Sequence, residues 1–281
     1  MKQYLDALKY VLENGVDRKD RTGTGTRAVF GMQLRFNMEN GFPAVTTKKL
    51  PWKSVASELL WFIEGSGDER RLAEILYGTR DAGKTTIWTA NAEADYWKPK
   101  AKFQGDLGRI YGIQWRRWKS PDGKEIDQLA NAIKMIKENP TSRRIIVNAW
   151  NPGELNQMAL PPCHAFFQFF AADNKLSLQM YQRSCDMFLG VPFNIASYSL
   201  LLHMVSQATG LKPHEFVHVL ADTHIYHNHF EQVKEQLSRK PFKLPALFLN
   251  PEIKNIDDFK MADIKLENYE GHPAIKAEMA V

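Results

Sequence analysis

The spacing of apolar residues along the chain predicts both helices and strands. Apolar side chains recur at the helical period in four stretches, at residues 2–14, 52–62, 127–139 and 193–210. Gly15 and Gly210 follow two of these stretches and Pro140 follows a third, as is typical of helix C-termini. The longest stretch, 193–210, is therefore expected to form a central helix.

Short apolar runs bounded by turn residues predict the strands. They lie at residues 28–36, 145–150, 165–170 and 176–180. The last run is followed by Tyr-Gln-Arg-Ser-Cys-Asp (181–186), and together they predict a strand that ends in polar groups. The mixture of helices and strands, without internal repeats, indicates an α/β (α+β) fold and leaves the strand topology open.

Length and composition narrow the class of protein. The 281 residues are 44% hydrophobic and contain no Pro/Gly/Ser-rich linker, so one domain over 1–281 is expected. The net charge of +5 favours an anionic partner, whether a nucleotide, a polyglutamylated cofactor or nucleic acid. No apolar stretch approaches about eighteen residues, the first residues lack a signal-peptide core, and two cysteines imply no disulfide framework. A soluble, cytoplasmic protein without a membrane partner is expected.

Cys163 is the first candidate for chemistry, because it follows Pro161-Pro162 directly before the apolar run 165–170. One interpretation is a structural cysteine, since free cysteine is among the most buried residue types. The other is a nucleophile, since a nearby cation lowers the pKa of a thiol and Arg183 and His164 could supply that cation. The residues alone leave both interpretations open.

Two further polar residues lie within apolar helices. Glu58 in the helix 52–62 is either on its solvated face or a desolvated carboxylate whose raised pKa suits proton transfer. Asn194 near the start of the helix 193–210 is either a helix cap or an amide that offers a donor and an acceptor to a ligand.

Basic and histidine-rich segments also have a structural and a functional interpretation. The loop 20–27 carries Arg21 between glycines and hydroxyl residues, which fits a hairpin turn or a phosphate-binding loop. Arg143 and Arg144 precede the strand 145–150, where paired arginines are usually solvated. The histidines of 224–229 have no accompanying cysteine or paired carboxylate, so no metal site is expected.

Seven motifs in one order and spacing resemble the thymidylate synthase family. They are Asp20–Thr26 (DRTGTGT), Ser57–Phe62 (SELLWF), Gly108–Gly112 (GRIYG), Ser142–Arg144 (SRR), Leu160–His164 (LPPCH) with Tyr181–Asp186 (YQRSCD), Leu189–Tyr198 (LGVPFNIASY) and Asp222–Tyr226 (DTHIY). The resemblance runs to Ala280-Val281 and covers nearly the whole chain. It implies a large mixed, mostly antiparallel sheet covered by helices, and a homodimer formed through the sheet.

The resemblance also implies a role for each matching residue. Catalysis is assigned to Cys163, Glu58, Tyr111 and Asn194. Binding of the dUMP nucleotide is assigned to Arg21, Arg143, Arg144, His164, Gln182, Arg183, Ser184, Asn194, His224 and Tyr226, with the paired arginines 143 and 144 reaching the partner subunit's nucleotide. Binding of 5,10-methylenetetrahydrofolate is assigned to Lys48, Trp88, Asp186, Gly190 and the terminal Val281, without a metal.

Three activities follow as hypotheses. The first is reductive methylation of dUMP to dTMP through a bond from Cys163 to C6. The second is hydroxymethylation, in which water attacks the same intermediate. It is suggested by departures from the family at Gly67-Asp68, Thr89 and Arg109, in or next to the divergent segment 65–104. The third is nucleic-acid binding on an inactive scaffold, suggested by the aromatic and basic stretch 96–102. The intact Cys163, Asn194 and Glu58 favour an enzyme. Leu220-Ala221, directly before the last motif, also departs from the family. Ala221 stands where the family usually has glycine, so a different local backbone conformation is possible there.

Overall fold

One six-stranded sheet organises the part of the chain described by this computed structural model, residues 1–19 and 23–278. The strand order is β1-β2-β8-β7-β6-β5. The bounds are β1 (Val16–Arg18), β2 (Thr26–Asn37), β5 (Ile146–Asn148), β6 (His164–Ala172), β7 (Lys175–Asp186) and β8 (Lys212–Tyr226). Only the pairing of β7 with β8 is parallel among these described strands, so the sheet is mixed and mostly antiparallel, as expected.

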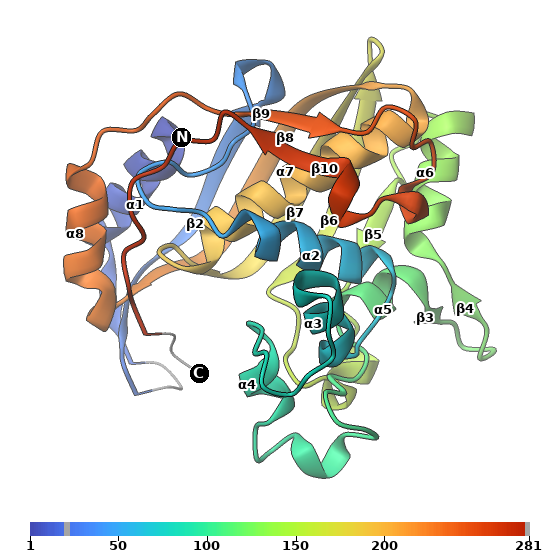
Figure 1. Cartoon of the computed structure of the whole chain (residues 1–281), viewed down its shortest axis with the longest axis horizontal. Helices are drawn as coiled ribbons and strands as arrows, with labels where there is room; N and C mark the ends of the chain where they lie inside the picture. The colour runs from blue at the N-terminus through green and yellow to red at the C-terminus, as the bar shows by residue number, and fades with distance from the viewer. Residues whose placement is uncertain (20–22, 279–281) are drawn as a thin grey trace.

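A central helix connects the two parallel strands. α7 (Gly190–Thr209) follows β7 and precedes β8, and it packs against both. α2 (Trp52–Ile63) packs against α7, as Figure 1 shows. The other α-helices are α1 (Lys2–Asn14), α3 (Glu69–Tyr77), α4 (Thr89–Ala92), α5 (Tyr111–Arg116), α6 (Gln128–Glu138) and α8 (Phe230–Ser238). Two small antiparallel sheets pair β3 (Trp118–Lys119) with β4 (Glu125–Ile126) and β9 (Ala246–Leu249) with β10 (Ile264–Glu267).

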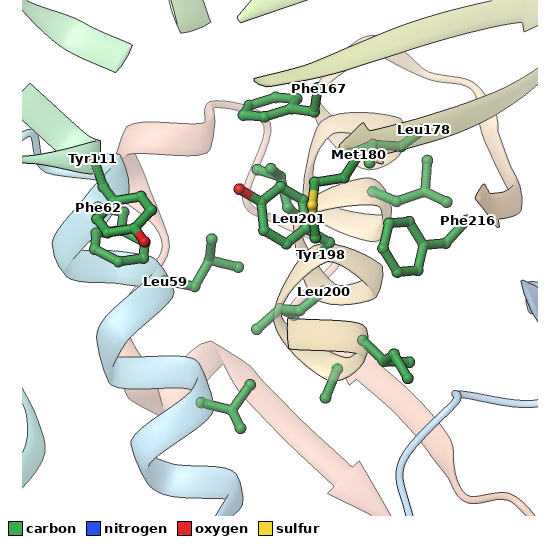
Figure 2. Packing of buried hydrophobic residues seen from close by; sticks show 14 of the residues in the cluster. Leu59, Phe62, Tyr111, Phe167, Leu178, Met180, Tyr198, Leu200, Leu201 and Phe216 are labelled. Atoms are coloured by element: carbon green, nitrogen blue, oxygen red, sulfur yellow. The ribbon is translucent and has the colours of Figure 1, made fainter. Parts of the chain in front are cut away.

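The hydrophobic core lies between the sheet and α7. Most side chains of α7 are buried, because the sheet covers one side of it and α2 and α6 cover others. Figure 2 shows Tyr198 and Leu201 of α7 between Leu59 of α2 and the strand residues Met180 and Phe216. Each fully buried side chain of this size contributes about 1.5–3 kcal/mol of transfer free energy. None of the helices in the described part of the chain combines the length and apolarity needed to cross a bilayer.

The opposite face of the sheet is not covered by helices at β6. Phe167 and Phe169 point into the core, and the alternating Phe166 and Phe170 are 37% and 66% exposed. Phe166 stacks on Tyr181 of the neighbouring strand, at 5.6 Å between ring centroids. An exposed aromatic face of this kind is typical of an interaction surface.

The structure confirms the four expected helices and corrects two boundaries. β7 includes the polar residues 181–186 at its end, as expected, because the strand is hydrogen-bonded on both sides, to β6 and β8. The helix expected at 193–210 begins earlier, at Gly190. Pro192 is compatible with this start because N–H groups in the first turn of a helix have no partner within the helix. The strand expected at 145–150 is shorter, Ile146–Asn148.

Candidate active site

The Pro-Pro-Cys segment is held at the start of β6 by bonds to α5 and β7. The Cys163 N–H donates to the Tyr111 hydroxyl (2.7 Å), and the Cys163 carbonyl accepts from the Arg183 N–H (2.8 Å). The Arg183 guanidinium donates to the carbonyls of Pro161 and Pro162 (2.9 and 2.8 Å). The segment is therefore fixed from two sides, and Cys163 stays half-buried with a free thiol.

Opposing influences act on the Cys163 thiol. Burial raises its pKa above the ordinary value, and the Arg183 guanidinium and hydrogen bonds with Tyr111 and Ser184 act to lower it. His164 is not the second cation that the sequence suggested, because burial, with Arg183, lowers its pKa to about 3 and leaves the ring neutral. Arg183 is thus the cation that favours the thiolate.

Asn194 lies inside α7, so the helix-cap interpretation is wrong. The N-cap position of α7 is Leu189, and the Asn194 side chain is buried against polar groups of the sheet. Its Oδ1 accepts from Gln182 Nε2 (3.1 Å), and its Nδ2 contacts His164 Nε2 (3.3 Å). The amide therefore lies between a side chain of β7 and one of β6.

A backbone carbonyl determines the direction of this amide. Gln182 Nε2 also donates to the Ser184 carbonyl (2.9 Å), so the Gln182 oxygen must face His218, whose Nε2 lies 2.8 Å away. Because Gln182 presents a donor, Asn194 must turn its oxygen towards Gln182 and its nitrogen towards His164. One N–H and one lone pair of Asn194 remain available for a base edge.

The motifs did not single out His218 and Tyr198 as site residues. His218 is fully buried, and burial lowers its pKa to about 3, so it is a neutral donor to Gln182. The Tyr198 hydroxyl lies 3.0 Å from His164 Nδ1 at the other end of the chain of bonds. Tyr198 follows Asn194 by one helical turn, and His218 alternates with the core residue Phe216, so periodicity could have identified both as inward-facing polar residues.

Glu58 is buried inside the helix bundle, which excludes the interpretation that it lies on a solvated face. Its Oε1 accepts from the Trp88 indole Nε1 (2.7 Å). Burial raises the Glu58 pKa from 4.5 to about 7, against the opposing hydrogen bond from Trp88. A carboxyl group with this pKa exchanges protons readily at neutral pH.

Tyr111 connects the thiol side of the site with the carboxylate side. Its ring stacks on Phe62 at 4.9 Å between centroids, and Figure 2 shows the two rings side by side. It meets Trp88 edge-on at 5.7 Å and lies 4.4 Å from the His164 ring. Burial raises the pKa of Tyr111 well above its ordinary value, so its hydroxyl is neutral.

Lys48, Asp186 and Gly190 meet around the start of α7. The Lys48 ammonium donates to the Phe188 carbonyl and lies 3.6 Å from the Phe188 ring centroid, and burial lowers its pKa to about 8. Asp186 Oδ1 accepts from the N–H groups of Phe188 and Leu189 (2.9 and 3.1 Å). A Cβ at Gly190 would make only ordinary contacts of 3.7 Å, so the packing does not demand glycine there.

His224 and Tyr226 lie at the end of β8. His224 Nδ1 is 3.2 Å from Asp222 Oδ1, and the His224 and Tyr226 rings meet edge-on at 5.3 Å. The pairing of β8 with β2 keeps one register on both sides of Leu220 and Ala221. The departure at these two residues therefore leaves the backbone of the motif in regular strand form.

The three histidines near residue 226 face different partners. His227 Nε2 lies 3.1 Å from Asp17, His229 Nε2 lies 2.7 Å from the Glu278 carbonyl, and His224 faces Asp222. Among the residues that the structure describes, no three His, Cys, Asp or Glu side chains are grouped to hold a metal ion.

Arg143 and Arg144 are exposed just before β5. Within residues 1–19 and 23–278, neither guanidinium forms an ion pair or a side-chain hydrogen bond. Arg21 and Val281, which the resemblance also assigned to the site, lie outside the described residues.

The departures from the family near the site are built into the packing. Gly67 is required because a Cβ there would lie 2.5 Å from the Gly108 carbonyl oxygen. Asp68 caps α3 by accepting from the Arg70 N–H (2.9 Å). Arg109 Nε donates to Glu154 (2.6 Å), which fixes the backbone two residues before Tyr111.

A groove of about 700 Å³ lies away from Cys163, between α2, α5 and the segment 256–261. The guanidiniums that line it already have partners: Arg71 pairs with Glu64, Arg116 pairs with Asp127 and Asp257, and Arg117 donates to the Gly65 carbonyl. The chemistry of Cys163, Asn194 and Glu58 is therefore separate from this groove.

The comparison with known families agrees with this geometry. The family model described as thymidylate synthase matches residues 2–281, essentially the whole chain. The match includes every described segment that contributes to the site, from Lys48 to Tyr226. The chain therefore belongs to the thymidylate synthase family.

Proposed function

We propose that this protein converts dUMP to dTMP by reductive methylation at C5, with 5,10-methylenetetrahydrofolate as co-substrate and dihydrofolate as second product. Membership of the thymidylate synthase family supports a folate-dependent one-carbon transfer to dUMP. The observation that carries the proposal is the arrangement around Tyr111. There a free thiol, an amide of fixed direction and a buried carboxyl group with a pKa of about 7 come together.

Asn194 supports uracil as the base. Its free lone pair accepts a hydrogen bond from uracil N3–H, and its free N–H donates to O4. Cytosine offers the opposite pattern at both atoms, an acceptor at N3 and a donor at its amino group. Because the Ser184 carbonyl prevents the Gln182–Asn194 pair from turning over, a cytosine would leave polar groups unpaired.

Cys163 is the proposed nucleophile. Its thiolate adds to C6 of the base, which makes C5 nucleophilic and moves negative charge to O4. The Arg183 guanidinium favours the thiolate, and the Asn194 N–H stabilises the charge that develops at O4. The C6 adduct is undone at the end of the cycle by release of the same thiolate.

Glu58 and Tyr111 are the proposed groups that move the C5 proton. The Glu58 carboxyl holds or releases a proton near pH 7, and the Trp88 indole fixes its orientation. The neutral Tyr111 hydroxyl lies beside the Cys163 backbone and therefore beside the base that Cys163 attacks. Both side chains are buried, so their protons are shielded from bulk water.

The residues around α7 fit the folate. When bound, the folate supplies the one-carbon unit and the hydride that reduces it. Asp186 is half-buried and uses only Oδ1 for hydrogen bonds within the described residues, so its other oxygen suits the N–H donors of a pterin. Lys48 and Gly190 lie beside Asp186, and these residues, with Trp88 and Val281, are proposed to bind the folate.

A homodimer is part of the proposal. The exposed aromatic face of β6 supports a partner subunit, and Arg143 and Arg144 are exposed cations without partners in the described chain. We propose that they bind the nucleotide phosphate of the partner subunit, while Arg21, Arg183 and Ser184 bind that of their own. His224 and Tyr226 are proposed to bond the deoxyribose hydroxyl.

The stretch 96–102 does not favour nucleic-acid binding. Trp97 is buried and its indole donates to the Asp106 carbonyl (2.6 Å), so it cannot stack on a base. The Tyr96 hydroxyl donates to the Ala159 carbonyl (2.8 Å), and Lys98 pairs with Glu93 (2.6 Å). These contacts tie the stretch to its own fold.

Mass analysis of the nucleotide formed from dUMP and methylenetetrahydrofolate tests the function. We expect dTMP together with dihydrofolate, and no product from the Cys163→Ser variant. Formation of 5-hydroxymethyl-dUMP with tetrahydrofolate would instead identify the hydroxymethylase reaction and contradict the reductive step. Unchanged dUMP with the wild-type protein would contradict one-carbon transfer altogether.

A further inference from the structure

We propose that Glu69 is a positioning residue of the site: with the hydroxyls of Thr86 and Thr89, it holds the turn that places Trp88 against Glu58. This inference rests on the proposed function for the role of Glu58. It gives a role to Glu69, Thr86 and Thr89, which lie in the divergent segment 65–104 and which the proposed mechanism does not use.

Glu69 is a carboxylate buried with its neighbour at the start of α3. It is 1% exposed, and its two oxygens accept from Arg70 Nε (2.6 Å) and Arg70 Nη2 (2.5 Å). Arg70 also donates to the carbonyls of Asp81 and Lys84 (2.7 and 3.0 Å). Burying an ion pair costs desolvation free energy. Further hydrogen bonds to both side chains are needed to offset that cost.

Thr86 and Thr89 supply those further bonds. Each hydroxyl donates to Glu69 Oε1 at 2.7 Å. Each hydroxyl oxygen also accepts a hydrogen bond from the backbone of the same turn. The Thr86 N–H donates to Thr89 Oγ1 (2.8 Å), and the Trp88 N–H donates to Thr86 Oγ1 (3.2 Å). The turn 86–89 is therefore attached to α3 through Glu69 Oε1.

Trp88 is the residue that this turn presents to the site. Its indole donates to Glu58 at 2.7 Å, and its ring lies 5.9 Å from Trp61 and 5.7 Å from Tyr111. The preceding residues 80–85 are all exposed, and α4 after the turn has only four residues. Because neither flank is a long packed element, the orientation of the indole depends on the attachment to Glu69.

Fluorine NMR of protein labelled with 5-fluorotryptophan measures this positioning directly. The chain has seven tryptophans, and the resonance lost in Trp88→Phe identifies Trp88. In wild-type protein without nucleotide, we expect this resonance to shift with pH as Glu58 titrates. Because no substrate is present, the measurement is independent of which reaction the protein catalyses.

The variants separate positioning from folding. Thr89→Val and Glu69→Gln should each reduce the pH-dependent shift of Trp88 by half or more, and Thr89→Ser, which keeps the hydroxyl, should restore it. Thr89→Val leaves the Glu69–Arg70 pair intact, so it stays folded even if a Glu69 variant does not. Thr85→Val is the matched control, because the Thr85 side chain is exposed one residue before the turn.

A double-mutant cycle connects the positioning with turnover. We expect Thr89→Val to lower kcat about tenfold with a smaller change in the KM for dUMP, as for a misplaced catalytic group. In the Trp88→Phe background, the same change should have little further effect, because Glu69 and Thr89 act through Trp88. An unchanged Trp88 titration in Thr89→Val and Glu69→Gln, or equal losses of kcat in both backgrounds, would overturn the inference. Absence of wild-type turnover with an intact Trp88 titration would instead contradict the proposed function.

Discussion

The direction of the Asn194 amide depends on atoms that are distant from the base. The Ser184 carbonyl orients Gln182, and Gln182 in turn orients Asn194. His164 completes the arrangement: because the Asn194 amide nitrogen can only donate, His164 Nε2 accepts, and His164 Nδ1–H donates to the Tyr198 hydroxyl. We therefore expect base choice to depend on a hydrogen-bonded chain across β7, α7 and β6.

The first prediction concerns base choice. Asn194→Asp removes the amide N–H that would donate to uracil O4. The oxygen that replaces the amide nitrogen faces His164, whose other tautomer can donate to it. Each unpaired polar group costs about 1–3 kcal/mol, so the dUMP/dCMP ratio of kcat/KM should fall about tenfold or more. A ratio that stays within about threefold of wild type, below that cost, would remove Asn194 from base recognition.

The second prediction concerns pH and Glu58. Because the pKa of Glu58 is about 7 in the fold and 4.5 ordinarily, its neutral form is favoured. That contribution to stability is fully present below pH ~4.5 and is lost as pH rises to ~7, on the order of 3 kcal/mol. Glu58→Gln should lack this decline in the free energy of unfolding, measured in urea between pH 5 and pH 8. The same variant should lose roughly 10²–10⁴ in kcat. A parallel decline in both proteins would contradict the assignment.

The third prediction distinguishes the two cysteines. Cys163→Ser should abolish turnover and leave dUMP binding, measured by calorimetry, within a few-fold of wild type, because recognition rests on the arginines and Asn194. Cys185 is fully buried and its Sγ donates to the Gln182 carbonyl, so Cys185→Ala should keep activity and cost about 1 kcal/mol of stability. Appreciable turnover by Cys163→Ser would exclude Cys163 as the nucleophile.

At the scale of elements, the docking of α5 on α2 positions Tyr111. A Cβ at Gly112 would lie 2.5 Å from the Phe62 carbonyl oxygen, so the two helix backbones come close only because residue 112 is glycine. The neighbouring Tyr111 ring stacks on Phe62 as a result. Backbone contact between the helices thus determines where the Tyr111 hydroxyl meets Cys163.

The fourth prediction tests this contact. Gly112→Ala should force α5 away from α2, cost about 1–3 kcal/mol of stability, and lower kcat more than the KM for dUMP because Tyr111 moves. Gly153→Ala is the control, since its nearest contact would be an ordinary 3.5 Å to Asn151 Oδ1. Equal melting temperatures for wild type and Gly112→Ala would show that the helices are not in such close contact.

At the scale of the molecule, the sheet determines which surface is left for a partner. α7 and α2 occupy one side of it, and the aromatic residues Phe166 and Phe170 remain exposed on the other. Arg143 and Arg144 lie at the same edge of the fold, next to β5. A site completed by these arginines from a second subunit requires a symmetric dimer.

The fifth prediction follows from a shared site. Cys163→Ser and Arg143→Ala should each be nearly inactive alone, and should regain up to about a quarter of wild-type activity when mixed and allowed to exchange subunits. Each heterodimer then holds one site with both an intact thiol and an intact arginine. Proven exchange without recovery would place Arg143 outside the partner's site.

Features that depend on neighbouring residues were readable from the sequence. The apolar period located α1, α2, α6 and α7, because a helix buries one face at regular spacing. The motifs around Cys163 and Asn194 indicated the family, which the match over residues 2–281 confirms. Boundaries were less certain: the start of α7 was placed at Phe193 and not at Gly190, and β5 was expected to be longer, because apolarity alone does not show where backbone hydrogen bonds begin and end.

Features that depend on contacts between distant residues were decided only by the tertiary structure. Burial by the surrounding fold makes His164 neutral and raises the Glu58 pKa, although both residues have ordinary local sequences. The direction of the Asn194 amide comes from Gln182, on another element. The attachment of the Trp88 turn to Glu69 joins residues that are seventeen to twenty positions apart. Desolvation and hydrogen-bond direction exist only once the chain is packed, so these properties follow from the fold and not from the order of the residues.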